Sequence, residues 1–244
     1  MTTKNHTNSF KKTARIANKF HRKIALIAGF GLLLMIVSIM LAEVMAMAGI
    51  IVDGDAAVTV DNIITNQSRF RFGIVAYLGV AILDLVVAWA FYVFLKPAKD
   101  DLSLLAAWSR LVYTIILGIA LVNLYSVFQL LGNADYLSAF ETPQIQAQVM
   151  LLVNAFRDTW DVGYIFFGIH LFLLGIVAFR SGFIPKVIGI ILLLAGISYV
   201  VDYLGWILFP NLSLGVSFIF GWGELIFMVW LLIWGGKVEL PTSA

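Results

Sequence analysis

Residues 72–95 read FGIVAYLGVAILDLVVAWAFYVFL, an apolar run interrupted by a single charged residue, Asp84. At about 1.5 Å of rise per residue, roughly 20 such residues in a helix cross the hydrocarbon core of a bilayer, which is about 30 Å thick. Arg71 and Lys96 flank the run on its two sides. This stretch predicts a membrane-spanning helix with a carboxyl group near its middle.

The whole chain has the composition of an integral membrane protein. Of its 244 residues 61% are hydrophobic and 12% are charged, and the mean hydropathy is +0.97, which excludes an ordinary soluble domain. The absence of cysteine excludes disulfides, thiolate zinc sites and cysteine nucleophiles. Five more apolar runs accompany the first: Ile24–Met47, Leu102–Leu130, Trp160–Phe179, Ile184–Phe209 and Leu214–Trp234. We predict an all-α polytopic membrane helix bundle with six transmembrane helices and short interfacial helices in the outer loops.

The distribution of basic residues predicts how the bundle is oriented. If the amino terminus lies inside, only Arg69, Arg71 and Arg157 of the 16 Lys and Arg residues fall in outer segments. Positive residues collect on the cytoplasmic side, so both termini are expected in the cytoplasm, in a bacterial inner (plasma) membrane. The basic charge then serves topology, and no nucleic acid partner is expected.

The predicted transmembrane domain, residues 24–237, lies between two cytoplasmic tails. Residues 1–23 form a basic tail that is either an amphipathic helix on the anionic leaflet or a solvated segment. Residues 238–244 form a short second tail.

The first outer loop contains IIVDGDAAVTVDNI, residues 50–63, whose acids invite comparison with a calcium loop. An EF-type loop that starts at Asp53 needs a bidentate acid at its twelfth position, which here is Ile64. The alternative is a turn at Gly54 followed by a short interfacial helix over residues 56–64. Asp55 is the expected N-cap of that helix.

The segment from Pro143 to Arg180 presents a problem of length. As one helix it would be roughly 57 Å long, well beyond the membrane. We therefore predict an outer interfacial helix that starts at Pro143, with Thr142 as its N-cap, and ends near Phe156. The fourth span would follow Arg157, and a boundary ion pair would join Arg157 to Asp161 four residues on.

Six ionisable residues fall inside the predicted spans and are the candidate ligand-binding residues. Asp84, His170 and Glu224 lie near the middle of the membrane, Glu43 and Asp202 in its outer half, and Arg110 in its inner half. Charged groups in hydrocarbon are costly and commonly mark function. Four carboxyl groups outnumber one arginine and one histidine, so the surplus acids need protons, hydrogen-bond partners, a cation or a water-filled cavity.

Three interpretations fit these residues. In the structural one, Arg110 pairs with Asp84 or Glu224, and the other acids are protonated or bonded to Tyr, Trp and backbone, for example Asp202 by a phenol or indole of its own helix. In the binding interpretation, a polar cavity open to the outside binds or passes a small molecule, lipid, cation or proton.

In the third interpretation His170, Asp84 and Glu224 hold a metal that activates water for hydrolysis. The sequence has no HExxH or GxSxG motif to support an enzyme and indicates no specific cofactor. The binding interpretation is therefore favoured, with the intramembrane metal-dependent hydrolase and a structural or accessory role as alternatives.

Several stretches resemble a bacterial multi-pass membrane family called domain of unknown function 4386. The most distinctive is YIFFGIHLFLLGIVAFRSGFIPKVIGIILLLAGISYVVD, residues 164–202, and the pieces GDAAVTVDNI, FRFGIVAYLGVAILDLVVAWAFYVFLKP and SRLV resemble it as well. The positions of Asp84, Arg110, His170, Asp202 and Glu224 fit the same pattern. The resemblance implies a six-span inner-membrane protein and supplies no activity. Asp53 is a departure, since the family often has proline before the Gly-Asp.

Overall fold

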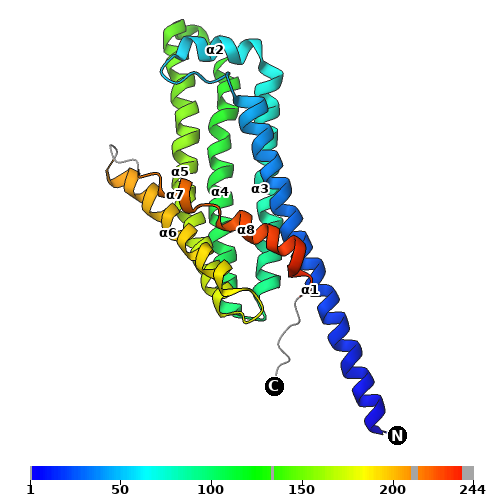
Figure 1. The fold of residues 1–244 in the computed structure, drawn as a ribbon. Coiled ribbons are helices and arrows are strands. Elements are labelled where there is room, and N and C mark those ends of the chain that lie inside the picture. The colour runs from blue at the N-terminus through cyan, green and yellow to red at the C-terminus, as the bar shows by residue number, and fades with distance from the viewer. Residues whose placement is uncertain (1, 133–134, 210–213, 238–244) are drawn as a thin grey trace.

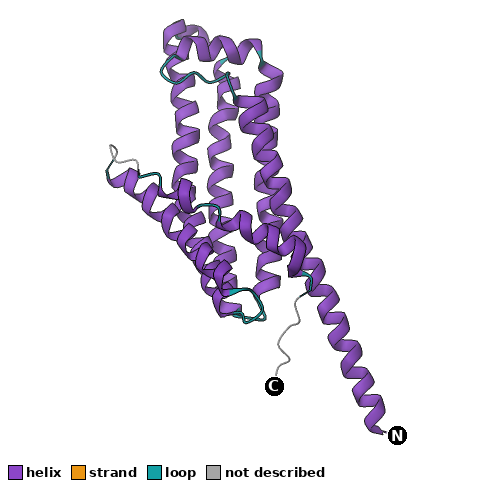
Figure 2. Ribbon diagram, in the orientation of Figure 1, coloured by secondary structure: helices purple, strands orange, loops and turns teal. Residues whose placement is uncertain are grey.

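The structure is a computed structural model that describes residues 2–132, 135–209 and 214–237. Its elements in chain order are α1 (Thr2–Met40), the π-helix η1 (Leu41–Met47), α2 (Ala56–Thr65), α3 (Gln67–Leu95), α4 (Asp100–Leu130), the 3₁₀-helix η2 (Asp135–Ala139), α5 (Thr142–Arg180), α6 (Lys186–Leu208), α7 (Val216–Phe220), α8 (Gly223–Trp230) and the π-helix η3 (Leu231–Gly235) (Figure 1). The described part of the chain contains no strand (Figure 2). Six helical segments are long and apolar enough to cross a membrane, so the predicted all-α, multi-pass architecture is confirmed.

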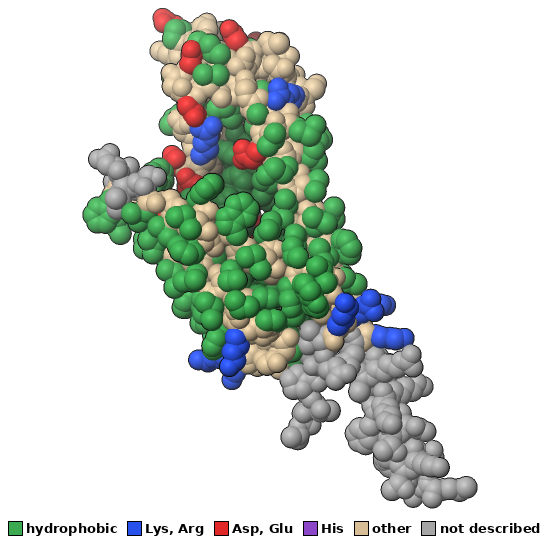
Figure 3. Space-filling model, in the orientation of Figure 1, with side chains coloured by type: hydrophobic (Ala, Val, Ile, Leu, Met, Phe, Trp, Pro, Cys, Tyr) green, Lys and Arg blue, Asp and Glu red, His purple; other side chains and the backbone are tan. Residues whose placement is uncertain are grey.

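The bundle has two unlike ends. Helices α3, α4 and α5 stand upright side by side, α1 packs along α3, and α2 lies across one end, which we call the α2 end (Figure 1). The opposite end, here the basic end, carries Lys96, Lys99, Arg180 and Lys186 at the two helix connections. The face drawn in Figure 3 shows Lys and Arg at this end, whereas Asp and Glu gather toward the α2 end, where some Lys and Arg lie as well. On this face the two ends of the molecule therefore differ in charge.

The last three helices form a shorter layer that crosses the upright helices obliquely. Helix α6 returns from the basic end along α5 and stops well short of the α2 end, and α8 and η3 run back to α1 (Figure 1). The sequence predicted one uninterrupted helix here. Instead α7 ends at Phe220 and α8 begins at Gly223, because the glycines at 221 and 223 weaken a continuous helix. The break places Glu224 in the first turn of α8.

Helix α5 corrects the predicted break near Phe156. It runs without interruption from Thr142 to Arg180 and therefore projects past the other spans at the α2 end (Figure 1). The physical reason is packing: Val149, Val153 and Phe156 are buried along the projecting part, where α2 and α4 cover the helix. The N-cap is also one residue earlier than predicted. Glu141 caps the helix and Gln144 accepts from the Glu141 N–H at 2.9 Å, which completes a capping box.

The predicted short helix in the first outer loop is confirmed. Asp55 caps α2 by accepting a 3.0 Å hydrogen bond from the Val58 N–H, and Gly54 takes a positive φ of 80° in the preceding turn. Thr59 ties the helix to the loop, since its Oγ1 accepts from the Val52 N–H at 3.0 Å. The stretch that resembles a calcium loop is therefore a capped turn.

Both predicted tails are described only in part. Helix α1 begins at Thr2 and continues without a break into the first span, so the described part of the basic tail, residues 2–23, is helical. The side chains of residues 2–18 lie outside the described set, and so does the predicted tail of residues 238–244. The predicted amphipathic contact of the first tail with the leaflet stays a prediction.

The contact between α5 and α6 is close enough to require glycine. A Cβ on Gly196 of α6 would lie 2.5 Å from the Phe172 N atom and 2.6 Å from the Gly168 oxygen, both on α5. Small residues at helix crossings let backbones approach in membranes, where packing drives association. This contact fixes the stretch of α5 that carries His170.

Candidate functional site

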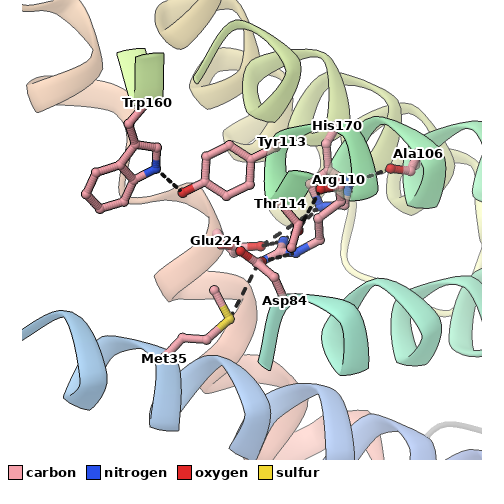
Figure 4. Close-up of polar contacts among 9 residues, drawn as sticks. All are labelled: Met35, Asp84, Ala106, Arg110, Tyr113, Thr114, Trp160, His170 and Glu224. Carbon is pink, nitrogen blue, oxygen red and sulfur yellow. Dashed lines mark hydrogen bonds and ion pairs between the residues drawn. The ribbon is translucent and has the colours of Figure 1, made fainter. Parts of the chain in front are cut away.

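Arg110 lies at the centre of the molecule, where α1, α3, α4, α5 and α8 meet (Figure 4). Its side chain is fully buried, and its Nε donates a 2.7 Å hydrogen bond to Asp84 Oδ1 on α3. Its Nη1 donates to Glu224 Oε1 on α8, so one guanidinium pairs with two carboxylates. The guanidinium also lies 5.7 Å and 5.6 Å from the ring centres of Phe91 and Phe167. We call Asp84, Arg110, His170 and Glu224 the Arg110 cluster.

His170 completes the cluster as a neutral ring. Its Nδ1 lies 2.8 Å from the Ala106 carbonyl oxygen, which can only accept, so Nδ1 carries the proton. Its Nε2 is then an acceptor and lies 3.1 Å from Arg110 Nη1, which donates to it. His170 therefore orients the guanidinium and adds no charge to the cluster.

The charges in the cluster do not balance. Two carboxylates face one guanidinium, while the fourth member is a neutral histidine. The second oxygen of Asp84, Oδ2, is buried and has no hydrogen-bond partner among the described residues. Burying an uncompensated charge costs several kcal/mol even after relaxation, roughly the cost of one broken buried pair. The arrangement therefore calls for one further positive charge.

Glu224 is the member of the cluster that can be reached. Its side chain is 15% exposed, whereas Asp84 and Arg110 are fully buried. It lines a cavity of about 230 Å³ between α1 and the α6–α8 layer, and the walls of this inner cavity are mainly apolar and aromatic. The lining includes Met35, Ile39, Tyr113, Tyr164, Phe167, Tyr199, Trp222 and Met228. The cluster thus has one exposed edge, and it opens into this inner cavity.

A second cavity lies nearer the α2 end. It measures about 360 Å³ and is lined by Glu43, Arg157, Asp161 and a wall of rings, Tyr77, Phe156, Trp160 and Tyr164. Tyr164 lines both cavities, so they are neighbours along α5. Figure 3 shows a hollow on this face of the molecule, with acidic side chains around it. We call this space the outer cavity.

Glu43 and Asp202 lie apart from the Arg110 cluster. Glu43 Oε1 accepts a 2.5 Å hydrogen bond from the Tyr77 hydroxyl in the outer cavity. Asp202 was expected to bond a phenol or indole of its own helix. Instead its carboxylate accepts from the backbone N–H groups of Val216 at 3.1 Å and Ser217 at 2.5 Å, because these begin α7 and have no helical partner. Of the six candidates, the structure brings together Asp84, Arg110, His170 and Glu224.

Arg157 and the proposed metal ligands have other partners than the sequence predicted. The predicted pair of Arg157 with Asp161 is wrong, since Arg157 Nη1 bonds Asp53 Oδ1 at 2.5 Å and so joins α5 to the first outer loop. The three proposed metal ligands do converge, but around Arg110, which occupies the position a metal cation would take. Over the described residues, no group of three histidines or acids is arranged to hold a metal ion.

Sequence reasoning missed several contributors to the site. Met35 places its sulfur 3.8 Å from Arg110 Nη2, and the Trp160 indole donates to the Tyr113 hydroxyl at 2.9 Å (Figure 4). The cavity residues Tyr164 and Tyr199 stack at 5.6 Å. The recurrence of aromatic residues at 160, 164 and 167 is the signal that could have predicted an aromatic wall, because positions three and four apart share a helix face.

Comparison with known proteins identifies the family. The model of the family described as "Domain of unknown function (DUF4386)" matches residues 27–235, which is most of the chain. The chain belongs to the DUF4386 family. The resemblance seen in the sequence is thereby confirmed, and the match includes all six candidate residues.

One relative of this DUF4386 protein is an uncharacterised protein of the archaeon Archaeoglobus fulgidus. The two are 32% identical over 172 residues, which cover 70% of this chain and 89% of the relative. The relatives of this DUF4386 protein are therefore not confined to bacteria. No solved structure matches the chain. The six apolar helices indicate a multi-pass membrane protein, and the family match names no ligand, so function is argued from the Arg110 cluster and its cavities.

Proposed function

We propose that this protein binds a cation within the membrane, in the simplest case a proton, at the surplus negative charge of the Arg110 cluster. The observation that carries the proposal is the shared guanidinium: Arg110 pairs with both Asp84 and Glu224, while Asp84 Oδ2 has no partner in the described structure. A proton on either carboxyl group makes the cluster neutral. Ionisable groups that pair inside membranes commonly form proton relays.

The inner cavity gives this proton a route of exchange. Glu224 is the exposed member of the pair, and the inner and outer cavities share Tyr164 on the way to the α2 end. A proton that arrives at Glu224 neutralises this carboxylate and leaves Arg110 paired with Asp84, so the cluster as a whole becomes neutral. Binding and exchange at this cluster is the function that the geometry supports best.

The proposed orientation of the protein in the membrane follows from the position of the basic end. The basic end, with Lys96, Lys99, Arg180 and Lys186, would face the cytoplasm, as would both termini, in the cytoplasmic membrane. The outer cavity then opens to the external side. Reporter fusions at residue 1 and at the α4–α5 connection test this, since the first should be active in the cytoplasm and the second outside.

Infrared spectroscopy of the purified protein in lipid nanodiscs tests the proton directly. A protonated buried carboxyl absorbs apart from the carboxylate and amide bands and shifts in D₂O. We expect such a band near neutral pH, and we expect Asp84→Asn and Glu224→Gln each to abolish it, because each removes the surplus charge. Asp100→Asn is the control, since Asp100 is an exposed acid that pairs with Lys96.

A spectrum in which neither substitution alters the carboxyl region would overturn the proposal. The structural interpretation would then account for the cluster, because a bridging Arg110 is also what a purely structural role requires. A Glu224→Gln protein that still melts cooperatively but has lost the band would support the proton site, since a structural ion pair alone predicts no such band.

A further inference from the structure

The inner cavity combines a carboxylate with a wall of rings. Glu224 is its charged residue, and Tyr113, Tyr164, Phe167, Tyr199 and Trp222 supply the aromatic surface. The remaining lining is aliphatic or thioether, including Leu32, Met35 and Met228. An apolar pocket with few polar groups is the usual form of a small-molecule site.

The chemistry of this wall selects among ligands. A phosphate or carboxylate headgroup would meet Glu224 at like charge, and a neutral acyl chain would leave the surplus charge of the cluster unmatched. An inorganic cation prefers a shell of several oxygen ligands, which these mainly apolar walls do not provide. An organic ammonium ion matches both the carboxylate of Glu224 and the apolar wall. Its charge is attracted by the carboxylate and by the ring faces, and its carbon atoms pack against the apolar side chains.

The size of the inner cavity limits the ligand further. At about 230 Å³ it lies below the range of roughly 300–1,000 Å³ typical of drug-sized pockets. It is lined on one side by α1, through Leu32 to Ile39, and on another by α8 and the break before it. These surfaces carry exposed apolar residues, such as Leu33 at 37% and Trp222 at 55%. A small ammonium ion that partitions into the bilayer can reach such a site.

We propose that the inner cavity binds a small lipophilic ammonium ion, with its charge against Glu224 and its apolar part between Tyr199, Phe167 and Met35. The ligand takes the place of the proton on the Arg110 cluster, so one proton leaves as one cation enters. This exchange balances charge: an O–H bond of a carboxyl group breaks, the proton goes to solvent, and the carboxylate pairs with the ammonium. In this respect the inference rests on the proposed function.

The groups that face the two carboxyls determine which of them can titrate. They are Arg110 and Tyr113 on α4, His170 and Tyr164 on α5, and Tyr199 on α6, and α1 contributes only Met35 and its apolar neighbours. Arginine and the phenols keep their charge state near neutral pH, and the His170 lone pair is already used by Arg110. Asp84 and Glu224 are left as the pair that exchanges a proton for the ligand.

Equilibrium dialysis of benzyltrimethylammonium against the protein in neutral-lipid nanodiscs tests the inference. We expect saturable binding of one ligand per chain, and about 10- to 100-fold weaker binding after Glu224→Gln, because a charge-assisted contact is lost. Trp222→Leu should weaken binding a few-fold through loss of a ring face. Asp100→Asn, at an exposed acid far from the cavity lining, is the matched control that leaves it unchanged. In weak buffer, ligand addition should release one proton per site.

The outcomes separate the two proposals. Absence of saturable binding, or binding that Glu224→Gln leaves unchanged, overturns the ammonium site even if the carboxyl infrared band is present. Binding that depends on Glu224 without proton release, in a protein that lacks the band, overturns the proton proposal and keeps the ammonium site. Binding with proton release supports both. Because Glu224→Gln removes one partner of Arg110, an unchanged circular-dichroism spectrum and a single cooperative melting transition of the same preparation establish that the variant is folded.

Discussion

The Arg110 cluster and the outer cavity both contain acids and an arginine, yet burial makes them different kinds of site. In the cluster, Arg110 is fully buried and bridges two carboxylates. In the outer cavity, Arg157 is 44% exposed and pairs with Asp53, which is 75% exposed. The same residue types therefore hold helices together in the buried cluster, whereas in the outer cavity their side chains are in contact with water.

This difference is one of dielectric environment. Attraction between charges grows as water is excluded, and so does the cost of leaving a charge without a partner. Removing a single group should thus have a large effect at the cluster and a small one at the outer cavity. Substitutions at the cluster and at the outer cavity test this difference.

Arg110→Met should have the largest effect. It leaves Asp84 and Glu224 facing each other without a cation in a buried site, which should cost about 3–5 kcal/mol of unfolding free energy. Reversible unfolding in mixed detergent micelles measures this change. Adding Asp84→Asn and Glu224→Gln to the Arg110→Met protein should recover part of the loss. Equal stability of Arg110→Met and the natural protein would show that the cluster does not hold the helices together.

The two acids should be strongly coupled through Arg110. Asp84→Asn and Glu224→Gln each leave one carboxylate for one guanidinium, so each single variant should stay folded with a modest loss. The double variant strands a buried guanidinium, and its loss should exceed the sum of the single losses by roughly 1–3 kcal/mol. The three melting curves in the same detergent measure this. Additive losses would mean that Arg110 does not link the two carboxylates.

The sequence predicts those parts of the structure that depend on local or compositional signals. The six spans follow from apolar runs, and the α2 cap follows from Asp55 standing just before a helix. The pairing of Arg110 with Asp84 or Glu224 was foreseeable because a buried arginine requires an acid, and few acids lie within the membrane.

The parts that the sequence did not predict depend on contacts between distant segments. Arg157 suggested a membrane boundary in α5, but α2 and α4 cover the projecting turns and keep the helix whole. Asp202 was matched to nearby rings on its own helix, whereas its partners are backbone N–H groups at the start of α7. The inner cavity is lined in part by Gly221 and Trp222, where the last span is broken, and hydropathy does not predict such a break.

Tyr77→Phe should have an effect between those at the cluster and at Arg157. It removes one hydrogen bond, from a neutral hydroxyl to a carboxylate, at the wall of the outer cavity. The Tyr77 hydroxyl donates to Glu43, which is otherwise exposed. Removing it should cost about 1 kcal/mol or less, since water can replace the donor to Glu43. Thermal unfolding in detergent measures the loss, with Tyr125→Phe, an exposed tyrosine on α4, as the control. A loss as large as that of Arg110→Met would show that the outer cavity is as dry as the cluster.

Arg157→Gln should have the smallest effect. The Arg157–Asp53 pair joins α5 to the loop before α2, but both side chains are substantially exposed, so its contribution should be about 0.2–1 kcal/mol. Because mobile ions screen exposed pairs, raising the salt concentration should shrink the difference between the variant and the natural protein. The buried Arg110 pairs should show no such dependence on salt. A salt-independent loss at Arg157 would show that this pair is as shielded from water as the Arg110 pairs, and would remove the difference between the outer cavity and the cluster.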